Sequence, residues 1–179
     1  MDRLFLLFYT QPMDMAYLEM GIMLVLWTVF MIILRGKARK AAGIIFTALA
    51  VFAILFVTVI KRSPSEHGVN YIPLYTFKLA KAQPELIRTM EMNVFLFMPF
   101  GMSFPFFLPE KLRLKLLLTV SVALLFSACV ECAQYFLSLG MFDIDDVICN
   151  TLGAFIGFIP FAVCTRVDGF LRRHKEKRG

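Results

Sequence analysis

The stretch from Ala41 to Ile60 contains no charged side chain. A helix that crosses the hydrocarbon core of a bilayer needs about 20 mostly apolar residues, and this stretch has that length. A small water-soluble domain cannot hide such a run together with others like it. The stretch therefore predicts a membrane-spanning helix, and it defines the environment in which the rest of the chain folds.

The composition of the chain supports this prediction. Of 179 residues, 59% are hydrophobic and 18% are charged, whereas a soluble domain is about half apolar and about a quarter charged. Helices are expected rather than barrel strands, because the apolar runs do not alternate with polar residues. We predict one domain over residues 1–179, an all-α bundle of about five transmembrane helices. The expected spans are 17–34, 41–60, 92–108, 116–139 and 147–165.

The third of these spans is unusual because it contains Pro99, Gly101 and Pro105. Proline removes a backbone donor and clashes with the preceding turn, so we expect a kinked helix. Irregular backbone at membrane depth occurs where it is buried in protein or lines a wet cavity. The kink is either a simple bend, common in membrane helices, or the wall of a cavity.

Basic residues are concentrated in the connections 35–40 and 109–115 and in the tail 166–179. The connection between the last two spans contains no Lys or Arg. Because basic loops stay cytoplasmic, we expect the N-terminus outside and the C-terminus inside. The net charge of +6 then serves mostly as an anchor to anionic lipid, and no nucleic-acid partner is predicted.

Two segments outside the spans are expected to lie near the membrane surface. The apolar run Leu4–Tyr9 is too short for a signal-peptide core and is interpreted as an interfacial segment. The connection 61–91 is too long for a simple loop, although it lies on the outer side and carries five basic residues. Its apolar piece Tyr71–Leu79 is expected to lie in the interface or to fold back into the bundle.

Polar side chains interrupt the span 116–139 on one helical face. Ser127, Glu131, Gln134 and Ser138 follow one another at spacings that place them on the same side of a helix. Glu131 lies about eight residues, or roughly 12 Å, from the end of the run. An ionisable side chain at this depth usually marks a functional site. The alternative is a protonated glutamate with a purely structural role.

Three aspartates follow this span directly, namely Asp143, Asp145 and Asp146. One aspartate is enough to cap the next helix and to interact favourably with its dipole. Asp146 and Asn150 are one helical turn apart and share a face. The remaining acids are therefore candidates for a functional role.

Gly153 and Gly157 form a GxxxG pair that permits close approach of a partner helix. Packing of this helix on the span 116–139 would bring Asp146 and Asn150 toward the polar face of that span. Such a cluster could bind a cation, pair with an arginine such as Arg62 or Arg88, or contact a lipid head. Carboxylates and amides suit magnesium or calcium, but the spacing matches no EF-hand, so neither a metal nor a cofactor is predicted.

Cys129 and Cys132 form a CxxC pair in the same span. Such a pair suits a redox protein, but small apolar packing in a membrane helix is the simpler interpretation. The sequence contains no Ser-His-Asp or phosphate-loop signature, which makes an enzyme the less favoured class.

Four motifs between residues 60 and 160 resemble, in order, those of the VanZ-like family of membrane proteins. The residues that carry the resemblance are Asn70, Ile72 and Pro73; Asn93, Phe97, Pro99, Phe100 and Gly101; Glu131 and Gln134; and Asp143, Asp145, Asp146, Asn150, Gly153 and Gly157. One position departs from the pattern. Many members have an arginine just before the acidic stretch, where this chain has Gly140 and Met141. The role of that arginine is either absent or taken by Arg62 or Arg88.

The resemblance implies a polytopic bacterial membrane protein, and the family's namesake is tied to low-level teicoplanin resistance. Our first hypothesis is a protein that engages a lipid-linked cell-wall precursor, or alters how a glycopeptide reaches it, through an outward-facing cluster of acids and amides. The second is an intramembrane enzyme or a small proton- or cation-coupled transporter that uses Glu131 and the aspartates. The candidate residues are Asn70, Pro73, Asn93, Pro99, Gly101, Glu131, Gln134, Asp143, Asp145, Asp146 and Asn150.

Overall fold

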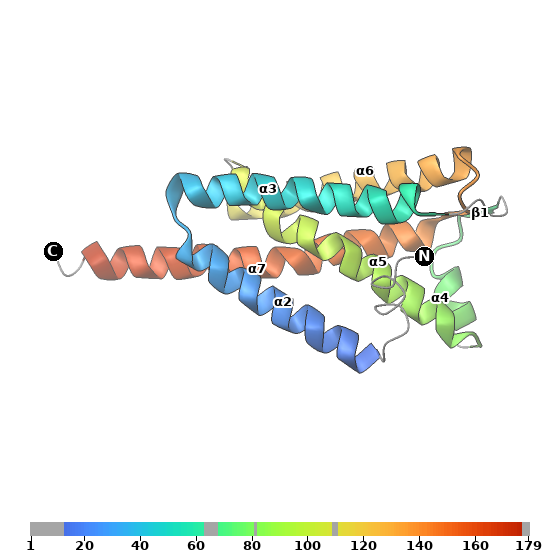
Figure 1. Ribbon diagram of the computed structural model, residues 1–179, viewed down its shortest axis with the longest axis horizontal. Helices are drawn as coiled ribbons and strands as arrows, with labels where there is room; N and C mark the ends of the chain where they lie inside the picture. Colours follow the sequence, from blue (N-terminus) through green and yellow to red (C-terminus); the bar gives the residue numbers. More distant parts are fainter. Residues whose placement is uncertain (1–12, 63–67, 81, 109–110, 177–179) are drawn as a thin grey trace.

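The computed structural model describes residues 13–62, 68–80, 82–108 and 111–176. Long helices run back and forth along one direction and form a single bundle (Figure 1). They are α2 (Met13–Ile33), α3 (Gly36–Leu55), α5 (Pro84–Ser103), α6 (Leu112–Phe136) and α7 (Ile144–Glu176). The all-α class predicted from the apolar runs is confirmed.

Shorter elements complete the chain. A π-helical turn (Phe56–Ile60) extends α3, a 3-10 turn (Phe104–Phe107) extends α5, and the short helix α4 (Tyr75–Ala80) precedes α5. Strands β1 (Val69–Asn70) and β2 (Phe142–Asp143) form a two-residue parallel pair. The sequence did not predict this pair, because two residues are too few to produce an alternating pattern.

Within the described residues, α2, α3, α6 and α7 are long and apolar enough to cross a membrane. The expected third span, 92–108, instead falls in the second half of α5 and the 3-10 turn after it. Helix α5 begins earlier than expected because Pro84 is favourable in the first turn and Glu85 complements the helix dipole. Its first half is polar, so α5 does not meet the requirement of length and apolarity that the other four long helices meet. Pro99 lies inside α5, and the kink that it predicts stays a prediction.

The boundaries of the last two helices also differ from those expected. Helix α6 ends at Phe136, because Ser138 has a φ of 58°, a left-handed conformation that cannot continue a helix. Ser138 therefore does not belong to the polar face of α6. Helix α7 does not stop at residue 165 but continues through the basic tail to Glu176, since Arg, Leu, Lys and Glu are strong helix formers.

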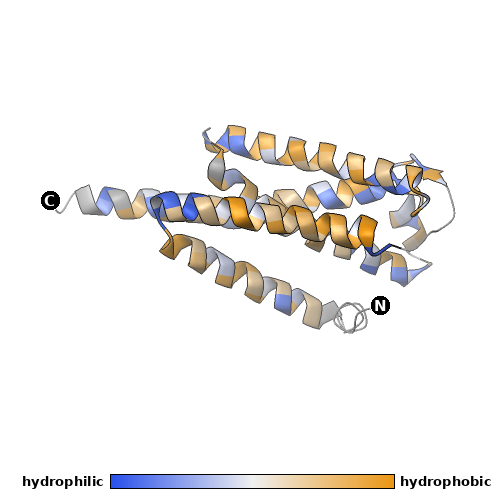
Figure 2. Ribbon diagram, turned by 45° about the horizontal axis from the view of Figure 1, so that its top comes forward, coloured by the Kyte–Doolittle hydropathy of each residue, from blue (hydrophilic) through white to orange (hydrophobic). Residues whose placement is uncertain are grey.

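Most residues along the helices are apolar, and hydrophilic residues gather toward the two ends (Figure 2). Large apolar side chains such as Leu26, Phe52 and Leu125 are 60–66% exposed. In water this exposure would be unfavourable, whereas in a bilayer lipid covers it. Together with the apolar helices, this surface indicates a multi-pass protein in a lipid bilayer.

The interior is built around α5. Phe97 and Phe100 of this helix are buried against Ile54 of α3, Ala123 of α6 and Ala154 of α7. Ring contacts with Phe126 and Phe104 extend the aromatic part of the core. Helix α5, whose first half is polar, is thus packed against α3, α6 and α7.

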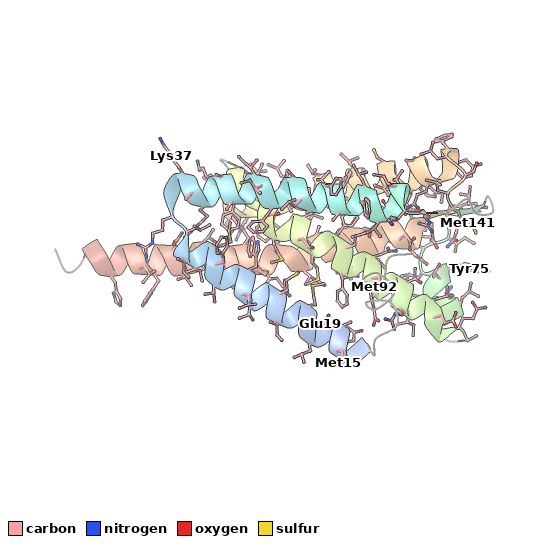
Figure 3. The ribbon with its side chains drawn as sticks, in the orientation of Figure 1. Met15, Glu19, Lys37, Tyr75, Met92 and Met141 are labelled. Carbon is pink, nitrogen blue, oxygen red and sulfur yellow. The ribbon has the colours of Figure 1, made fainter. Side chains whose placement is uncertain are left out.

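The two ends of the bundle differ in charge. The basic end contains the α2–α3 connection, the start of α6 and the end of α7 (Figures 1 and 3). The opposite end, called the cluster end below, contains residues 68–80 and 137–146. This arrangement groups the basic segments as expected, while the orientation of the chain in the membrane stays a prediction. The segment Leu4–Tyr9, expected to be interfacial, lies outside the described residues.

Candidate functional site

The polar residues predicted from the sequence gather at the cluster end, where Tyr75 and Met141 are labelled in Figure 3. We use the name polar cluster for the group of side chains that lie there. Its members are Asn70, Thr76, Asn93, Ser127, Glu131, Asp143, Asp145, Asp146 and Asn150. They come from β1, α4, α5, α6, β2 and α7, so segments distant in sequence build one site.

Asp143 connects the strand pair to the start of α7. Its Oδ1 accepts a hydrogen bond from Asn70 Nδ2 at 2.9 Å and another from the backbone N–H of Asp145 at 2.9 Å. Its Oδ2 accepts from the hydroxyl of Thr76 at 2.9 Å. The pairing of β1 with β2 places Asn70 directly opposite Asp143. Asp143 therefore caps the helix, as one of the three aspartates was expected to do.

Asp145 holds the turn that precedes α4. Its side chain is fully buried. Oδ1 accepts from the backbone N–H of Leu74 at 2.6 Å, and Oδ2 accepts from the backbone N–H of Thr76 at 2.8 Å. Leu74 has a φ of 64°, which is unfavourable for a residue with a side chain. The Asp145 carboxylate stabilises this turn, in which Pro73 also lies.

Glu131 and Asp146 lie at the centre of the polar cluster. Glu131 is 2% exposed, and its Oε2 accepts a hydrogen bond from the backbone N–H of Asp143 at 3.1 Å. Asp146 accepts a hydrogen bond from the side chain of Asn93. The two carboxyl groups are close enough to interact electrostatically. The structure thus brings Glu131 together with the acidic segment, as the hypothesis of a shared cluster required.

Two buried amide side chains donate a hydrogen bond through nitrogen, but within the described residues their amide oxygens accept none. Asn150 donates through Nδ2 to Ser127 Oγ at 2.8 Å, which joins α7 to α6. Gln134 donates through Nε2 to the carbonyl oxygen of Thr58 at 3.0 Å, which joins α6 to the π-helical turn. The other amide oxygens, Asn150 Oδ1 and Gln134 Oε1, are buried without a hydrogen-bond partner in the described part of the chain. Gln134 therefore contacts the π-helical turn that follows α3.

The glycines of α7 pack against α5. A Cβ atom on Gly153 would lie 2.1 Å from the carbonyl oxygen of Val94, and one on Gly157 would lie 2.1 Å from that of Met98. From the other side, a Cβ on Gly101 would lie 2.0 Å from the carbonyl oxygen of Ala154. These glycines form a seam that faces α5, while α7 also contacts α6 through the hydrogen bond between Asn150 and Ser127. The seam brings Asn93, which immediately precedes Val94, to Asp146.

Among the described residues, no group of three or more His, Cys, Asp or Glu side chains is arranged to hold a metal ion. Asp143 and Asp145 use their oxygens for donors of the protein itself. Cys129 and Cys132 are free thiols on the exposed side of α6. The cluster is therefore a hydrogen-bonded assembly of acids, amides and hydroxyls.

The family model of VanZ/LLP1 matches residues 20–165. This chain belongs to the VanZ/LLP1 family. The matched range contains every member of the polar cluster and all of the long helices except the ends of α2 and α7. Comparison with curated proteins and with solved structures finds no match.

In this VanZ-family protein, Arg62 lies against the position where many members carry an arginine. A Cβ on Gly140 would lie 3.1 Å from Nη2 and 3.3 Å from Cζ of Arg62. The guanidinium also interacts electrostatically with Glu131 and Asp146. Arg88 lies on α5. Arg62 thus lies beside Gly140 and near two carboxyl groups of the polar cluster.

Sequence reasoning did not single out Thr58, Leu74 and Thr76 of this VanZ-family protein. Leu74 and Thr58 contribute backbone groups, whose roles do not depend on the side chain and leave no signal in the sequence. Thr76 contributes both its backbone N–H and its hydroxyl. Its position three residues after Pro73 was the available signal, since proline is typical of turns.

Proposed function

We propose that this VanZ-family protein engages the polar head of a lipid-linked envelope component at the cluster end. In this proposal the protein lies in the plasma membrane of a bacterium, with the cluster end outside and the C-terminus in the cytoplasm. By occupying or shielding the head of a cell-wall precursor, it reduces the access of teicoplanin. Resistance is thus one consequence of a more general role in the cell envelope.

The observation that carries this proposal is the pair of hydrogen bonds from Leu74 and Thr76 to the buried carboxylate of Asp145. These bonds fix a segment with outward-facing aromatic side chains, of which Tyr71 is 75% and Phe77 is 46% exposed. Tyrosine at a membrane surface sits at the level of the lipid heads. A surface that is already ordered loses less conformational freedom when it binds a ligand.

The acids have a positioning role in this proposal. Asp143 and Asp145 accept hydrogen bonds from the loop and from the start of α7, so they shape the surface. The ligand itself would meet the exposed residues of segment 71–77. Rings such as that of Tyr71 can stack on sugars and hydrophobic groups, while the hydroxyl bonds polar heads.

The test is to express the protein in a susceptible Gram-positive host and to measure susceptibility to teicoplanin and to a lipoglycopeptide. We expect the wild-type protein to lower susceptibility, and Asp145→Asn and Tyr71→Ala to abolish the effect at equal membrane abundance. Phe136→Ala is the matched control, because Phe136 is an 80% exposed aromatic residue at the same end but outside the loop. Unchanged susceptibility with the wild-type protein would exclude resistance as its role.

A second candidate function rests on Glu131 and the unpaired amide oxygens. Glu131 is buried within a membrane-spanning helix, and Asn150 Oδ1 and Gln134 Oε1 lack partners in the described structure. Such groups suit an intramembrane enzyme or a proton- or cation-coupled transporter. The same assay discriminates the two. Loss of effect in both Glu131→Gln and Asp145→Asn, with Tyr71→Ala active, supports this second candidate and contradicts the first.

A further inference from the structure

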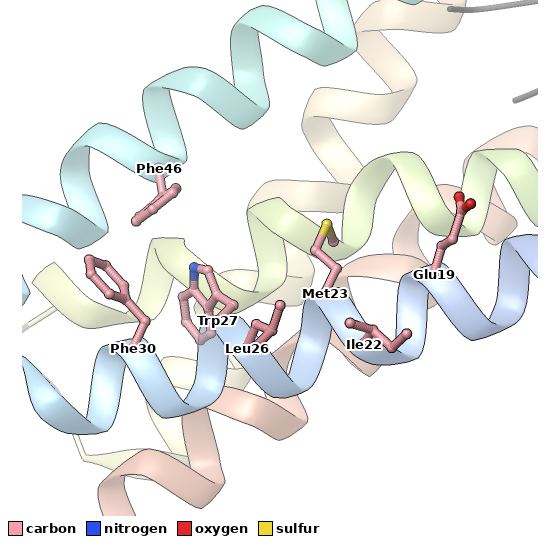
Figure 4. A pocket seen from close by; sticks show the side chains of 7 residues that line it. All are labelled: Glu19, Ile22, Met23, Leu26, Trp27, Phe30 and Phe46. Atoms are coloured by element: carbon pink, nitrogen blue, oxygen red, sulfur yellow. The ribbon is translucent and has the colours of Figure 1, made fainter. Parts of the chain in front are cut away.

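The basic end of the bundle differs chemically from the groove between α2 and α3 that Figure 4 shows. Apart from Glu19, every residue that lines the groove is apolar or aromatic, so the groove offers little that distinguishes one lipid head from another. At the basic end, the ammonium groups of Lys40 on α3 and Lys115 on α6 are instead close enough to interact electrostatically. Two neighbouring charges of the same sign attract a ligand of the opposite sign.

The register of α3 and α6 places these two lysines at the same level. The helices run in the same direction (Figure 1), and the hydrogen bond from Gln134 Nε2 to the carbonyl oxygen of Thr58 aligns them near the cluster end. Lys40 lies 18 residues before Thr58, and Lys115 lies 19 residues before Gln134. At 1.5 Å per residue, both lysines therefore lie about 28 Å along the bundle from that bond.

The 3-10 turn that extends α5 contacts both helices at this level. A Cβ atom on Gly43, three residues after Lys40, would lie 2.7 Å from Cβ of Phe106 in the turn. Lys115 Nζ donates a hydrogen bond to the carbonyl oxygen of Pro105, also in the turn, at 3.0 Å. An ammonium group has three N–H donors, so this bond leaves two of them for other acceptors.

In the described part of the chain, neither lysine forms an ion pair. The first turns of α3 and α6 carry no acidic residue, and the carboxylate of Asp168 on α7 pairs with Arg39. Lys115 is partly withdrawn from solvent, so the repulsion from Lys40 is screened less than it would be at an open surface. An anion that accepts hydrogen bonds from both ammonium groups would remove this repulsion.

The depth of the lysine pair indicates which anion is available. The apolar segments Gly36–Ile60 and Leu112–Phe136 begin four and three residues before Lys40 and Lys115. Both lysines therefore lie within about 6 Å of the end of the apolar layer. From there, the long side chain of lysine reaches the polar heads of the lipids. Phosphate is the anion that phospholipids carry at this level, and basic pockets between helices recognise anionic heads.

We propose that Lys40 and Lys115 form a binding site for the phosphate of one anionic phospholipid from the leaflet at the basic end. Each ammonium group donates to a phosphate oxygen, while Lys115 keeps its bond to Pro105. The lipid thereby ties the start of α3 to the start of α6. This inference does not depend on the proposed function, because the polar cluster lies at the opposite end of the bundle.

The test follows the unfolding temperature of the full-length protein in detergent as phosphatidylglycerol is added. A ligand that binds the folded protein raises this temperature. We expect a saturable rise with phosphatidylglycerol and a much smaller one with phosphatidylcholine, whose head carries a cation of its own. Lys40→Gln and Lys115→Gln are each expected to raise the lipid concentration at half-saturation about fivefold.

Lys37→Gln is the matched control, since it removes the same charge from the start of α3. The side chain of Lys37 points away from the bundle (Figure 3), so this variant is expected to leave half-saturation almost unchanged. Lys40→Arg keeps the charge and is expected to keep most of the binding. Lys40 is exposed, so the Lys40 variants decide the test if Lys115→Gln does not fold.

Three results would overturn the proposal. An equal effect of phosphatidylcholine would show that the charge of the head is not recognised. An equal effect of Lys37→Gln and Lys40→Gln would show a diffuse attraction of basic segments for anionic lipid in place of a defined site. A rise with inorganic phosphate as large as that with phosphatidylglycerol would identify free phosphate as the ligand.

Discussion

Asp145 shows how the backbone of the protein itself can satisfy a buried acidic side chain. Its carboxylate has no exposed surface, and each oxygen accepts one backbone N–H from the turn before α4. Backbone N–H groups of a turn have no helical partner of their own, so a carboxylate is an efficient way to satisfy two of them. The acid therefore stabilises a loop conformation in which Leu74 has a positive φ.

Asp145→Ala is expected to destabilise the protein more than Asp145→Asn. The alanine leaves two buried N–H groups without acceptors, at about 1–3 kcal/mol each, whereas the asparagine retains one acceptor. Thermal unfolding of the purified variants in detergent measures the difference. Asp145→Asn is the matched comparison, because it keeps the shape of the side chain. Equal unfolding temperatures for the alanine and asparagine variants would contradict this role.

Between elements, α5 and α7 approach each other closely. Three glycines allow the backbone of each helix to touch the other, with Gly101 on α5 and Gly153 and Gly157 on α7. Small residues serve this purpose in membranes because lipid gives helices no hydrophobic reason to associate. The seam aligns Asn93 with Asp146, so helix packing and site geometry depend on the same contact.

Gly153→Ala and Gly157→Ala are expected to destabilise the protein by about 1–3 kcal/mol or more, because the new methyl group forces the helices apart. Gly21→Ala is the matched control. A Cβ at Gly21 meets nothing within 4 Å, and alanine is favoured over glycine in a helix by about 1 kcal/mol. Unfolding in increasing concentrations of a denaturing detergent gives the comparison. If Gly153→Ala were as stable as Gly21→Ala, the seam would not be a close contact.

The helices themselves could largely be predicted from the sequence, since runs such as 41–60 leave few alternatives in lipid. Which helix packs against which could not be predicted from the sequence. A GxxxG pair indicates that something packs closely, but nothing in Gly153 or Gly157 distinguishes α5 from α6. The polarity of residues 84–91 also concealed the first half of α5. Glu131 was predicted correctly to lie near the aspartates, because a buried carboxyl in lipid requires polar neighbours.

At the scale of the whole molecule, polar contacts between side chains and backbone hold the helices together at both ends of the bundle. At the basic end, Arg39 of α3 forms an ion pair with Asp168 of α7 and donates to the carbonyl oxygen of Leu34 at 2.6 Å. Lys115 donates to the carbonyl oxygen of Pro105 at 3.0 Å and lies 5.1 Å from the ring centroid of Phe161. The polar cluster has the corresponding role at the other end.

Arg39→Leu is expected to destabilise the protein by up to about 3–5 kcal/mol, because it leaves Asp168 unpaired. The lower part of that range applies, since the Asp168 side chain is 24% exposed. The double variant Arg39→Leu/Asp168→Leu is expected to recover part of the loss. A double-mutant cycle of unfolding free energies measures the coupling. Additive effects of the two substitutions would show that the pair contributes nothing to stability.

Helix α7 is a continuous helix of 33 residues, which corresponds to about 50 Å. The hydrocarbon core is about 30 Å thick, so roughly 20 Å of this helix extends beyond it. Asp145 and Asp146 lie at one end of the helix, and Arg173 and His174 lie at the other. A tilt of α7 at its acidic end would therefore move its basic end through the aqueous phase on the opposite side of the membrane. Pro160 is the position inside α7 where the helix bends most easily.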